Sequence, residues 1–300
     1  MGGAPTIDGC NAAAYGWALR DVLMQELFPY LFSDDDINDL MRALVLELAS
    51  YLTEADGRTL RGDRPQTWQE LIGWMNGQGR QEFVGHGHSS GTVGAVYRRL
   101  RSAVMDGQHI FLLDARQGQP LCVTRTTTTP PQVIDIHSLS GALQRFVVAA
   151  ISKQVVADRV GRHAVPGLRY IIVLDELNRF APRGGRDPIT HLMEEVATER
   201  RSQGIILFGA QQFASEVSTK VVESASARAL GRTGSAELSD QVWRAWSPTA
   251  RRQANQLQLD KKLVMQPTFR APMLVKMPRP AWAMSRADIA DPSSDDIPEV

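Results

Sequence analysis

Apolar and polar positions in the first part of the chain follow the period of helices. Residues 15–32 and 33–54 both place apolar side chains at helical spacing, and Ser33 is the expected N-cap of the second helix. A shorter helix is predicted from Trp68 to Met75. Residues 1–84 are therefore predicted to form a helical segment. The expected apolar stripe of its second helix consists of Ile37, Leu40, Met41, Leu44 and Leu48.

From residue 85 onward, short β-like runs alternate with helices. Helices are predicted from near Thr92 and over residues 139–161. Between them, three short apolar runs bounded by turn residues predict strands at 109–114, 121–126 and 132–137.

Two strongly apolar runs follow at residues 169–175 and 204–210, and a helix is predicted between them over 189–201. Strands alternating with helical crossovers predict an α/β fold with a mainly parallel sheet covered on both faces. The remaining elements are predicted as a helix over 214–227, a third short strand within 227–234, helical pieces within 236–257 and a β-hairpin over 262–280.

Polar side chains stand at the ends of the two apolar strands. Asp175 and Glu176 follow the first, and Gln211 and Gln212 follow the second. Ligands of parallel sheets bind at the carboxyl ends of the strands, so both pairs are candidates for a site. The plainer alternatives are a capped turn for the acids and a satisfied sheet-edge backbone for the glutamines.

An apolar strand ending in Asp-Glu is typical of nucleotide triphosphate hydrolases. Asp175 is suited to hold Mg²⁺ through its water shell, and Glu176 to polarise the attacking water. A glutamine on the neighbouring strand can hydrogen-bond the γ-phosphate or that water, because its amide both donates and accepts.

Arg200 and Arg201 close the helix that precedes the second apolar strand. Cations at this end compensate the helix dipole and pair with Glu195 or Glu199, which explains them structurally. The functional alternative is an arginine finger that reaches the γ-phosphate of a neighbouring subunit. Their spacing alone does not choose between these readings.

Composition narrows the function classes. The net charge is zero, with 33 basic and 33 acidic residues, which disfavours a generally basic nucleic-acid binder but allows a local basic surface. Cys10 and Cys122 lack metal-ligand spacing, and we expect neither a signal peptide nor a membrane span, so a cytoplasmic protein is predicted. His86 with His88, and the run Asp34 to Asp36, are weaker metal candidates; a loop feature and dipole compensation explain them more simply.

The order of these motifs resembles the HerA/FtsK superfamily of RecA-like ATPases, and HerA-like proteins most closely. The resemblance rests on "IIVLDELNRFAP", "ERRSQGIILFGAQQFASEV" and "ARALGRTGSAELSD", and extends over residues 85–300. It implies a homo-hexameric ring that uses ATP and Mg²⁺ to move double-stranded DNA, with a possible nuclease partner. It further implies Asp175 for Mg²⁺, Glu176 for water activation, Arg201 as the finger with Arg200 as second choice, and Gln212 as the sensor beside Gln211.

The sequence departs from this family at the phosphate loop. Such motors need a glycine-rich loop ending in Gly-Lys-Ser/Thr before the strand acids, yet no lysine precedes Lys153. We expect the C-terminal portion of a longer ATPase, with residues 1–84 following the missing loop. The alternatives are a catalytically incomplete ring or scaffold subunit that supplies Arg201 in trans, and a secretion or conjugation ATPase that handles protein or single strands.

Overall fold

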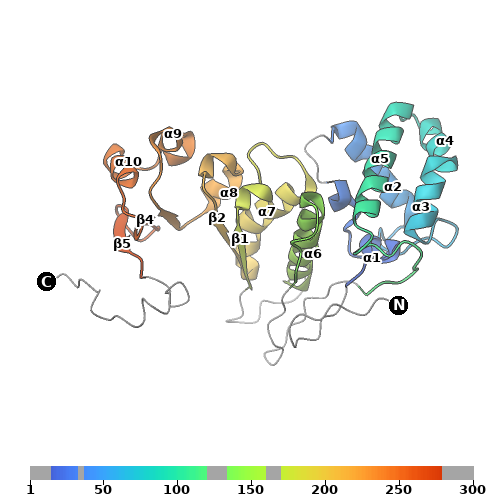
Figure 1. Cartoon of the computed structure of the whole chain (residues 1–300), viewed down its shortest axis with the longest axis horizontal. Coiled ribbons are helices and arrows are strands. Elements are labelled where there is room, and N and C mark those ends of the chain that lie inside the picture. The colour runs from blue at the N-terminus through green and yellow to red at the C-terminus, as the bar shows by residue number, and fades with distance from the viewer. Residues whose placement is uncertain (1–14, 33–36, 120–133, 160–169, 279–300) are drawn as a thin grey trace, which may run out of the picture. The chain divides into compact units, whose positions relative to one another are not determined.

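The computed structural model describes residues 15–32, 37–119, 134–159 and 170–278 of the chain. The chain divides into two compact units, Met1–Gln212 and Phe213–Val300. The predicted boundary between residues 84 and 85 falls inside the first unit. The first unit contains α1 (Leu19–Met24), η1 (Phe28–Phe32), α2 (Asp39–Leu52), α3 (Trp68–Asn76), α4 (Gln78–Gly85), α5 (Ser90–Asp106), α6 (Gly141–Arg159), β1 (Tyr170–Asp175), η2 (Leu177–Arg179), α7 (Pro188–Thr198), η3 (Arg200–Gln203) and β2 (Ile205–Ala210) (Figure 1).

The main hydrophobic core lies in the helical part of the first unit. Aromatic side chains from distant segments meet there: the ring of Trp17 lies 5.5 Å from that of Phe146, and Trp68 lies 5.3 Å from Phe111. All four are at most 1% exposed. Because Phe146 belongs to α6, this core joins the N-terminal helices to the helix that leads toward the sheet. Large buried rings of this kind dominate the energetics of a core.

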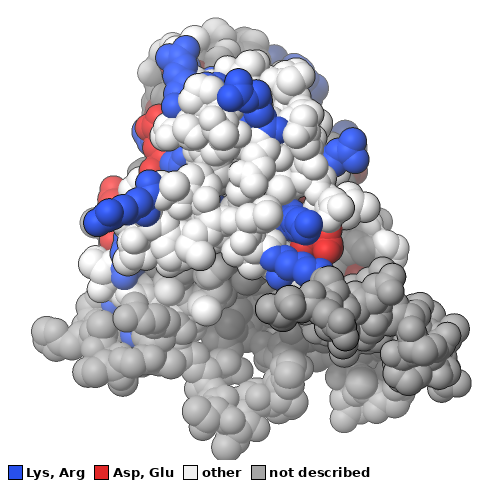
Figure 2. All heavy atoms as spheres, turned by 90° about the vertical axis from the view of Figure 1, so that its left-hand side faces the viewer, with Lys and Arg blue, Asp and Glu red and all other residues white. Residues whose placement is uncertain are grey.

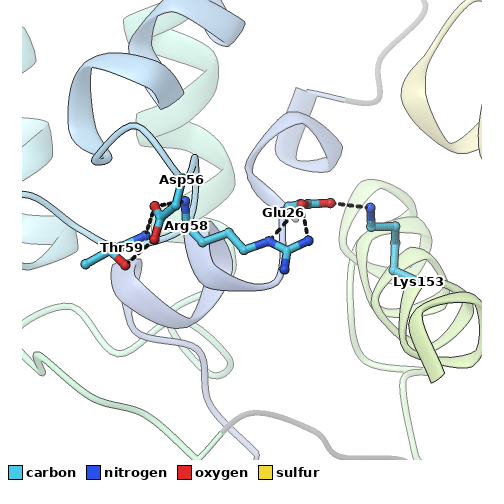
Figure 3. Close-up of polar contacts among 5 residues, drawn as sticks. All are labelled: Glu26, Asp56, Arg58, Thr59 and Lys153. Carbon is cyan, nitrogen blue, oxygen red and sulfur yellow. Dashed lines mark hydrogen bonds and ion pairs between the residues drawn. The ribbon is translucent and has the colours of Figure 1, made fainter. Parts of the chain in front are cut away.

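An ion-pair network ties α6 to the loops of the helical part (Figure 3). The Glu26 carboxylate accepts a hydrogen bond from Lys153 at 2.9 Å and from Arg58 at 2.8 Å. The Asp56 carboxylate lies at the other end of the network, beside Arg58, and accepts a hydrogen bond from the Thr59 hydroxyl at 2.6 Å. Hydrogen bonding to Lys153, and then to Arg58, lowers the pKa of Glu26. Glu26 therefore stays charged and holds three segments together.

The two apolar runs form the predicted parallel pair. β1 and β2 pair in parallel from Tyr170 with Ile205 to Asp175 with Ala210. Helix α7 connects them and contacts β2 and α6. The fold class predicted from the sequence, α/β with a parallel sheet, is confirmed.

The C-terminal unit contains η4 (Ala214–Glu216), α8 (Thr219–Ser224), β3 (Arg228–Leu230), α9 (Ser235–Leu238), η5 (Gln241–Trp243), α10 (Pro248–Asn255), β4 (Lys261–Met265) and β5 (Met273–Lys276). The predicted hairpin is β4–β5. β3 was expected among the alternating strands of the parallel sheet, but it pairs antiparallel with β4 instead. The three-stranded order β3-β4-β5 buries Leu230 and Leu263 on one face.

Several local predictions differ from the structure. Residues 109–114 form no strand. The Trp17 N–H donates to the Ile110 carbonyl, and the Trp17 carbonyl accepts from the Leu112 N–H, so this segment has an isolated bridge in place of a ladder. The described residues 134–137 are also irregular, and the predicted strand at 121–126 lies outside the described residues. Leu40 is 65% exposed, because α2 begins at Asp39 and its first turn faces outward.

The start of α2 also differs from the prediction. Asn38 is its N-cap and accepts a hydrogen bond from the Met41 N–H at 2.9 Å. Ser33, the predicted cap, and the acids Asp34 to Asp36 lie outside the described residues. Among those that are described, no helix combines the length and apolarity needed to cross a membrane.

Candidate functional site

The two candidate strand ends lie side by side at one edge of the sheet. Asp175 is the last residue of β1 and pairs with Ala210, the last residue of β2. Gln211 and Gln212 follow directly, so the sheet brings the acids and glutamines to the same edge, as the sequence predicts. Asp175, Glu176 and Gln212 are exposed there, whereas Gln211 is half-buried.

Glu176 has a left-handed backbone conformation, with φ 54° and ψ 53°. Such a conformation is unfavourable for a residue with a side chain and is found mostly at sites where the surroundings hold it in place. Asp175 Oδ1 accepts a hydrogen bond from the Glu176 N–H at 3.1 Å. The Glu176 carboxylate lies 3.5 Å from Arg179, whose guanidinium also donates to Gln144 of α6 at 2.7 Å. The turn thus orients the carboxylate with local bonds and helix α6.

Gly209 allows this turn to pack against β2. A Cβ atom at this position would lie 2.2 Å from Cδ2 of Leu177, which is only 4% exposed. Any side chain at residue 209 would therefore push Leu177 away and shift the residues on both sides of it. The absence of a side chain at Gly209 helps to fix the position of Glu176.

Gln211 offers an unused acceptor next to the acids. Its Oε1 is buried and has no hydrogen-bond partner among the described residues. A buried polar atom without a partner is costly, and such atoms in native folds usually bond a water, an ion or a ligand. The amide oxygen of Gln211 is therefore a candidate contact for a bound ligand.

The two arginines lie at the opposite edge of the sheet. Arg200 and Arg201 belong to η3, which precedes β2, and Arg200 forms an ion pair with Glu195 of α7. Arg201 is exposed and has no ion pair with any residue that the structure describes. β2 has six residues, so its first and last residues are separated by roughly 17 Å at ~3.3 Å per residue. Within one chain, the arginines cannot act on the edge that carries Asp175.

The metal candidates have different outcomes. At the sheet edge, Asp175 and Glu176 supply oxygen donors suited to Mg²⁺, which keeps several waters and needs few protein ligands when phosphates are present. His86 and His88 instead both bond the carboxylate of Glu47, at 2.8 and 2.7 Å. Hydrogen bonding to His88 lowers the pKa of Glu47. Across the described parts of the chain, no group of three His, Cys, Asp or Glu residues is arranged to hold a metal ion.

One face of the parallel pair is exposed and apolar. The exposed fractions are 58% for Ile171, 70% for Val173 and 57% for Phe208. The sequence analysis predicted cover on both faces, which parallel strands normally have, and this exposed face contradicts that prediction. The spacing of Ile171 and Val173 gave no sign of this exposure, because a continuous apolar run looks the same whether one or both faces are buried.

No protein-family model matches the sequence, and no curated protein matches it either. Solved structures do resemble it. VirB4 of Thermoanaerobacter pseudethanolicus matches with a TM-score of 0.55 and 14% identity over 88% of this chain and 71% of that one. The bacterial conjugative coupling protein TrwB gives 0.48 and 13%, over 88% and 72%.

The genome packaging NTPase B204 from Sulfolobus turreted icosahedral virus 2 gives a TM-score of 0.34 at 15% identity, over 43% of this chain and 61% of that one. This chain thus spans less than two thirds of that protein's length. The match to VirB4, together with the parallel β1–β2 pair, shows that the chain has the α/β fold of RecA-like P-loop ATPases.

Proposed function

We propose that this chain is the part of an ATP-driven motor that carries the strand acids and the sensor glutamine. The observation that carries the proposal is the register of β1 and β2, which brings Asp175 and Glu176 to the same edge as Gln211 and Gln212. The VirB4-like fold supports it, because RecA-like ATPases bind nucleotide at this edge of the sheet.

Each residue at the edge has a role in the proposed hydrolysis. Asp175 would hold Mg²⁺ through water, and the metal would neutralise charge on the phosphates of ATP. Glu176 would accept a proton from the attacking water, which is general-base catalysis worth about 10²–10⁴ in rate. Gln212, beside Gln211, would bond the γ-phosphate or that water and report the nucleotide state.

The arginines fit a role between subunits. Because Arg201 precedes β2 and so lies at the end of the sheet opposite to Asp175, it would serve the site of a neighbour in a homo-hexameric ring. Arg200 is the second choice, since Glu195 already pairs with it. The phosphate cradle has to come from polypeptide outside these residues, because the sequence contains no Gly-Lys-Ser/Thr.

The hydrolysis test uses the chain together with a polypeptide that supplies the Gly-Lys-Ser/Thr loop. We expect Glu176→Gln to lower ATP turnover by about a hundredfold or more, the loss expected for a general base. Glu199→Gln is the matched control, since Glu199 is an exposed acid at the end of α7. Undiminished turnover in Glu176→Gln would reject the assignment.

We further propose double-stranded DNA as the cargo. The described residues of the C-terminal unit, 213–278, contain ten Lys or Arg against five Asp or Glu, although the whole chain is neutral. Figure 2 shows basic side chains at several places on the face of this unit and few acidic ones. Such a surface attracts phosphates and does not suit a neutral protein cargo.

Salt dependence separates DNA from protein as cargo. Each lost phosphate contact reduces the slope of log affinity against log salt by about 0.9. The double variant Arg244→Gln/Arg252→Gln, at two exposed positions, should therefore bind duplex DNA more weakly and with a shallower slope. Arg101→Gln, an exposed arginine of α5, is the control. DNA binding that neither depends on salt nor changes in the double variant would favour a secretion-type ATPase with a protein cargo.

The scaffold reading makes a different prediction. A subunit that supplies only Arg201 and recruits a nuclease would leave hydrolysis in Glu176→Gln rings intact, whereas Arg201→Gln would abolish it. The unpartnered Gln211 oxygen at the acid edge favours a nucleotide site in this chain over a scaffold alone.

A further inference from the structure

A second cleft, separate from the sheet edge, lies between the start of α2 and the loop that leads into α7. Its volume is about 380 Å³, within the lower range of ligand pockets. One wall consists of residues 37–39 with Arg42, and the other of residues 182–187, "PRGGRD". No role proposed above uses this cleft.

The loop wall is a fixed structure. Asp187 is 2% exposed, caps α7 through the Ile189 and Thr190 N–H groups, and pairs with Arg145 at 2.8 Å. Gly185 donates its N–H to the Pro182 carbonyl at 3.0 Å, and a Cβ at Gly185 would lie 2.8 Å from the Thr190 hydroxyl. The turn is therefore tightly packed against the first turn of α7.

The charges that face the cleft are mainly positive. Arg42, Arg183 and Arg186 line it, against the acids Asp39 and Asp187. The charge of Asp187 is already compensated by its bonds to α7 and by Arg145. Asp39 is 86% exposed and lies 3.7 Å from Arg42, too far for a hydrogen bond. Among the described residues that line the cleft, Arg183 already has an interaction, so an anion would meet the guanidinium groups of Arg42 and Arg186 against the carboxylate of Asp39.

Arg42 provides a guanidinium at this wall, with Asp39 3.7 Å away. Its Nε is buried and has no hydrogen-bond partner among the described residues. A guanidinium binds a phosphate through parallel N–H donors, and the Arg42 side chain, which lines the cleft, is 28% exposed there. The first turn of α2 adds its helix dipole, which favours a negative group at the same wall.

We propose that this cleft is a binding site for a phosphate-bearing ligand, held by the guanidinium groups of Arg42 and Arg186. The cleft has room for more than one phosphate group, so a diphosphate fits its volume and charge. The same group occurs in small phosphorylated molecules and in the backbone of a nucleic acid. The proposal does not depend on hydrolysis at the Asp175 edge.

The test uses inorganic pyrophosphate as the probe and the full 300-residue chain in calorimetric titrations. We expect saturable binding of one pyrophosphate, weakened about tenfold or more by Arg42→Gln, the loss expected for a charge-assisted contact. Arg186→Gln should weaken it as well, and Arg42→Lys should recover only part of the affinity because it keeps the charge without the fork. Arg101→Gln is the matched control and should bind as the parent does.

Two further arms locate the site and its natural ligand. If Arg201→Gln weakens pyrophosphate binding and Arg42→Gln does not, the probe binds elsewhere and the proposal is overturned. Absence of saturable binding also overturns it. If a 12-residue oligothymidylate displaces pyrophosphate from the parent and this displacement is lost in Arg42→Gln, the result supports the cleft as the site and a nucleic-acid backbone as its natural ligand. If the oligonucleotide leaves pyrophosphate binding unchanged, the result supports the cleft as the site and a small phosphorylated molecule as its natural ligand.

Discussion

The left-handed conformation of Glu176 can be tested without any assay of function. At φ 54° a residue with a Cβ costs about 1–2 kcal/mol, which glycine avoids. Glycine in turn loses about 0.4–1 kcal/mol through the greater freedom of the unfolded chain. Both Glu176→Gly and Glu176→Ala lose the exposed ion pair with Arg179, so it cancels between them. Glu176→Gly should therefore be more stable than Glu176→Ala by about 0.5–1 kcal/mol.

The measurement is the free energy of unfolding from urea titrations with unchanged slopes. Ala43→Gly is the control: Ala43 is exposed within α2, where glycine should be less stable by about 0.5–1 kcal/mol. The only other positive φ outside glycine in the described residues is 57° at Glu26. There the glycine variant should again be more stable than the alanine variant. If Glu176→Gly is no more stable than Glu176→Ala, Glu176 does not keep this conformation in solution.

Two further predictions concern carboxylates that hold segments together. Because the folded pKa of Glu26 is lowered, its ion pairs stabilise the protein above the ordinary carboxyl pKa, and this contribution is lost as the pH falls through the lowered value. Lys153→Met should therefore lose less stability on acidification than the parent, as measured by urea midpoints from pH 7 to pH 3. A pH profile of the midpoint equal to that of the parent would contradict the network. Glu237→Ala should destabilise the C-terminal unit by about 2–4 kcal/mol, since it leaves the Ser215 hydroxyl and the Trp243 N–H without their acceptor. Glu237→Gln, which keeps an acceptor oxygen, should cost less in the same titration.

The sequence predicts the sheet edge well because the strands that form it are neighbours in the chain. Two continuous apolar runs joined by one helix are expected to pair in parallel, which brings the strand ends at Asp175 and Ala210, and the following Gln211, to the same edge. The same reasoning failed where pairing depends on a distant partner. Residues 109–114 have the composition of a strand, but Trp17 provides only a single bridge for Phe111. The pairing of β3 also depends on a later segment: it pairs antiparallel with β4 and not with the strands that precede it.

Features set by tertiary packing were beyond the sequence analysis. Next to the left-handed Glu176, Leu177 packs against the bare backbone of Gly209, a contact between residues 32 positions apart. A glycine within an apolar strand was the available signal, because such glycines often mark a close approach. The cleft beside Arg42 likewise joins the start of α2 to a loop about 140 residues later, which no local pattern predicts.

Two deficits of the first unit have a common remedy. The chemical one is the missing phosphate loop: no Gly-Lys-Ser/Thr occurs in the sequence, although the acids and the Gln211 oxygen are positioned at the sheet edge. The structural one is the exposed apolar face of Ile171, Val173 and Phe208 on a pair of parallel strands that needs cover and further strands for stability. A phosphate loop connects a strand to a helix, so one such unit would extend the sheet, cover its face and cradle the phosphates. The proposed catalytic role, with a phosphate loop and further strands supplied by another segment, accounts for both features, whereas the scaffold alternative accounts for the first only.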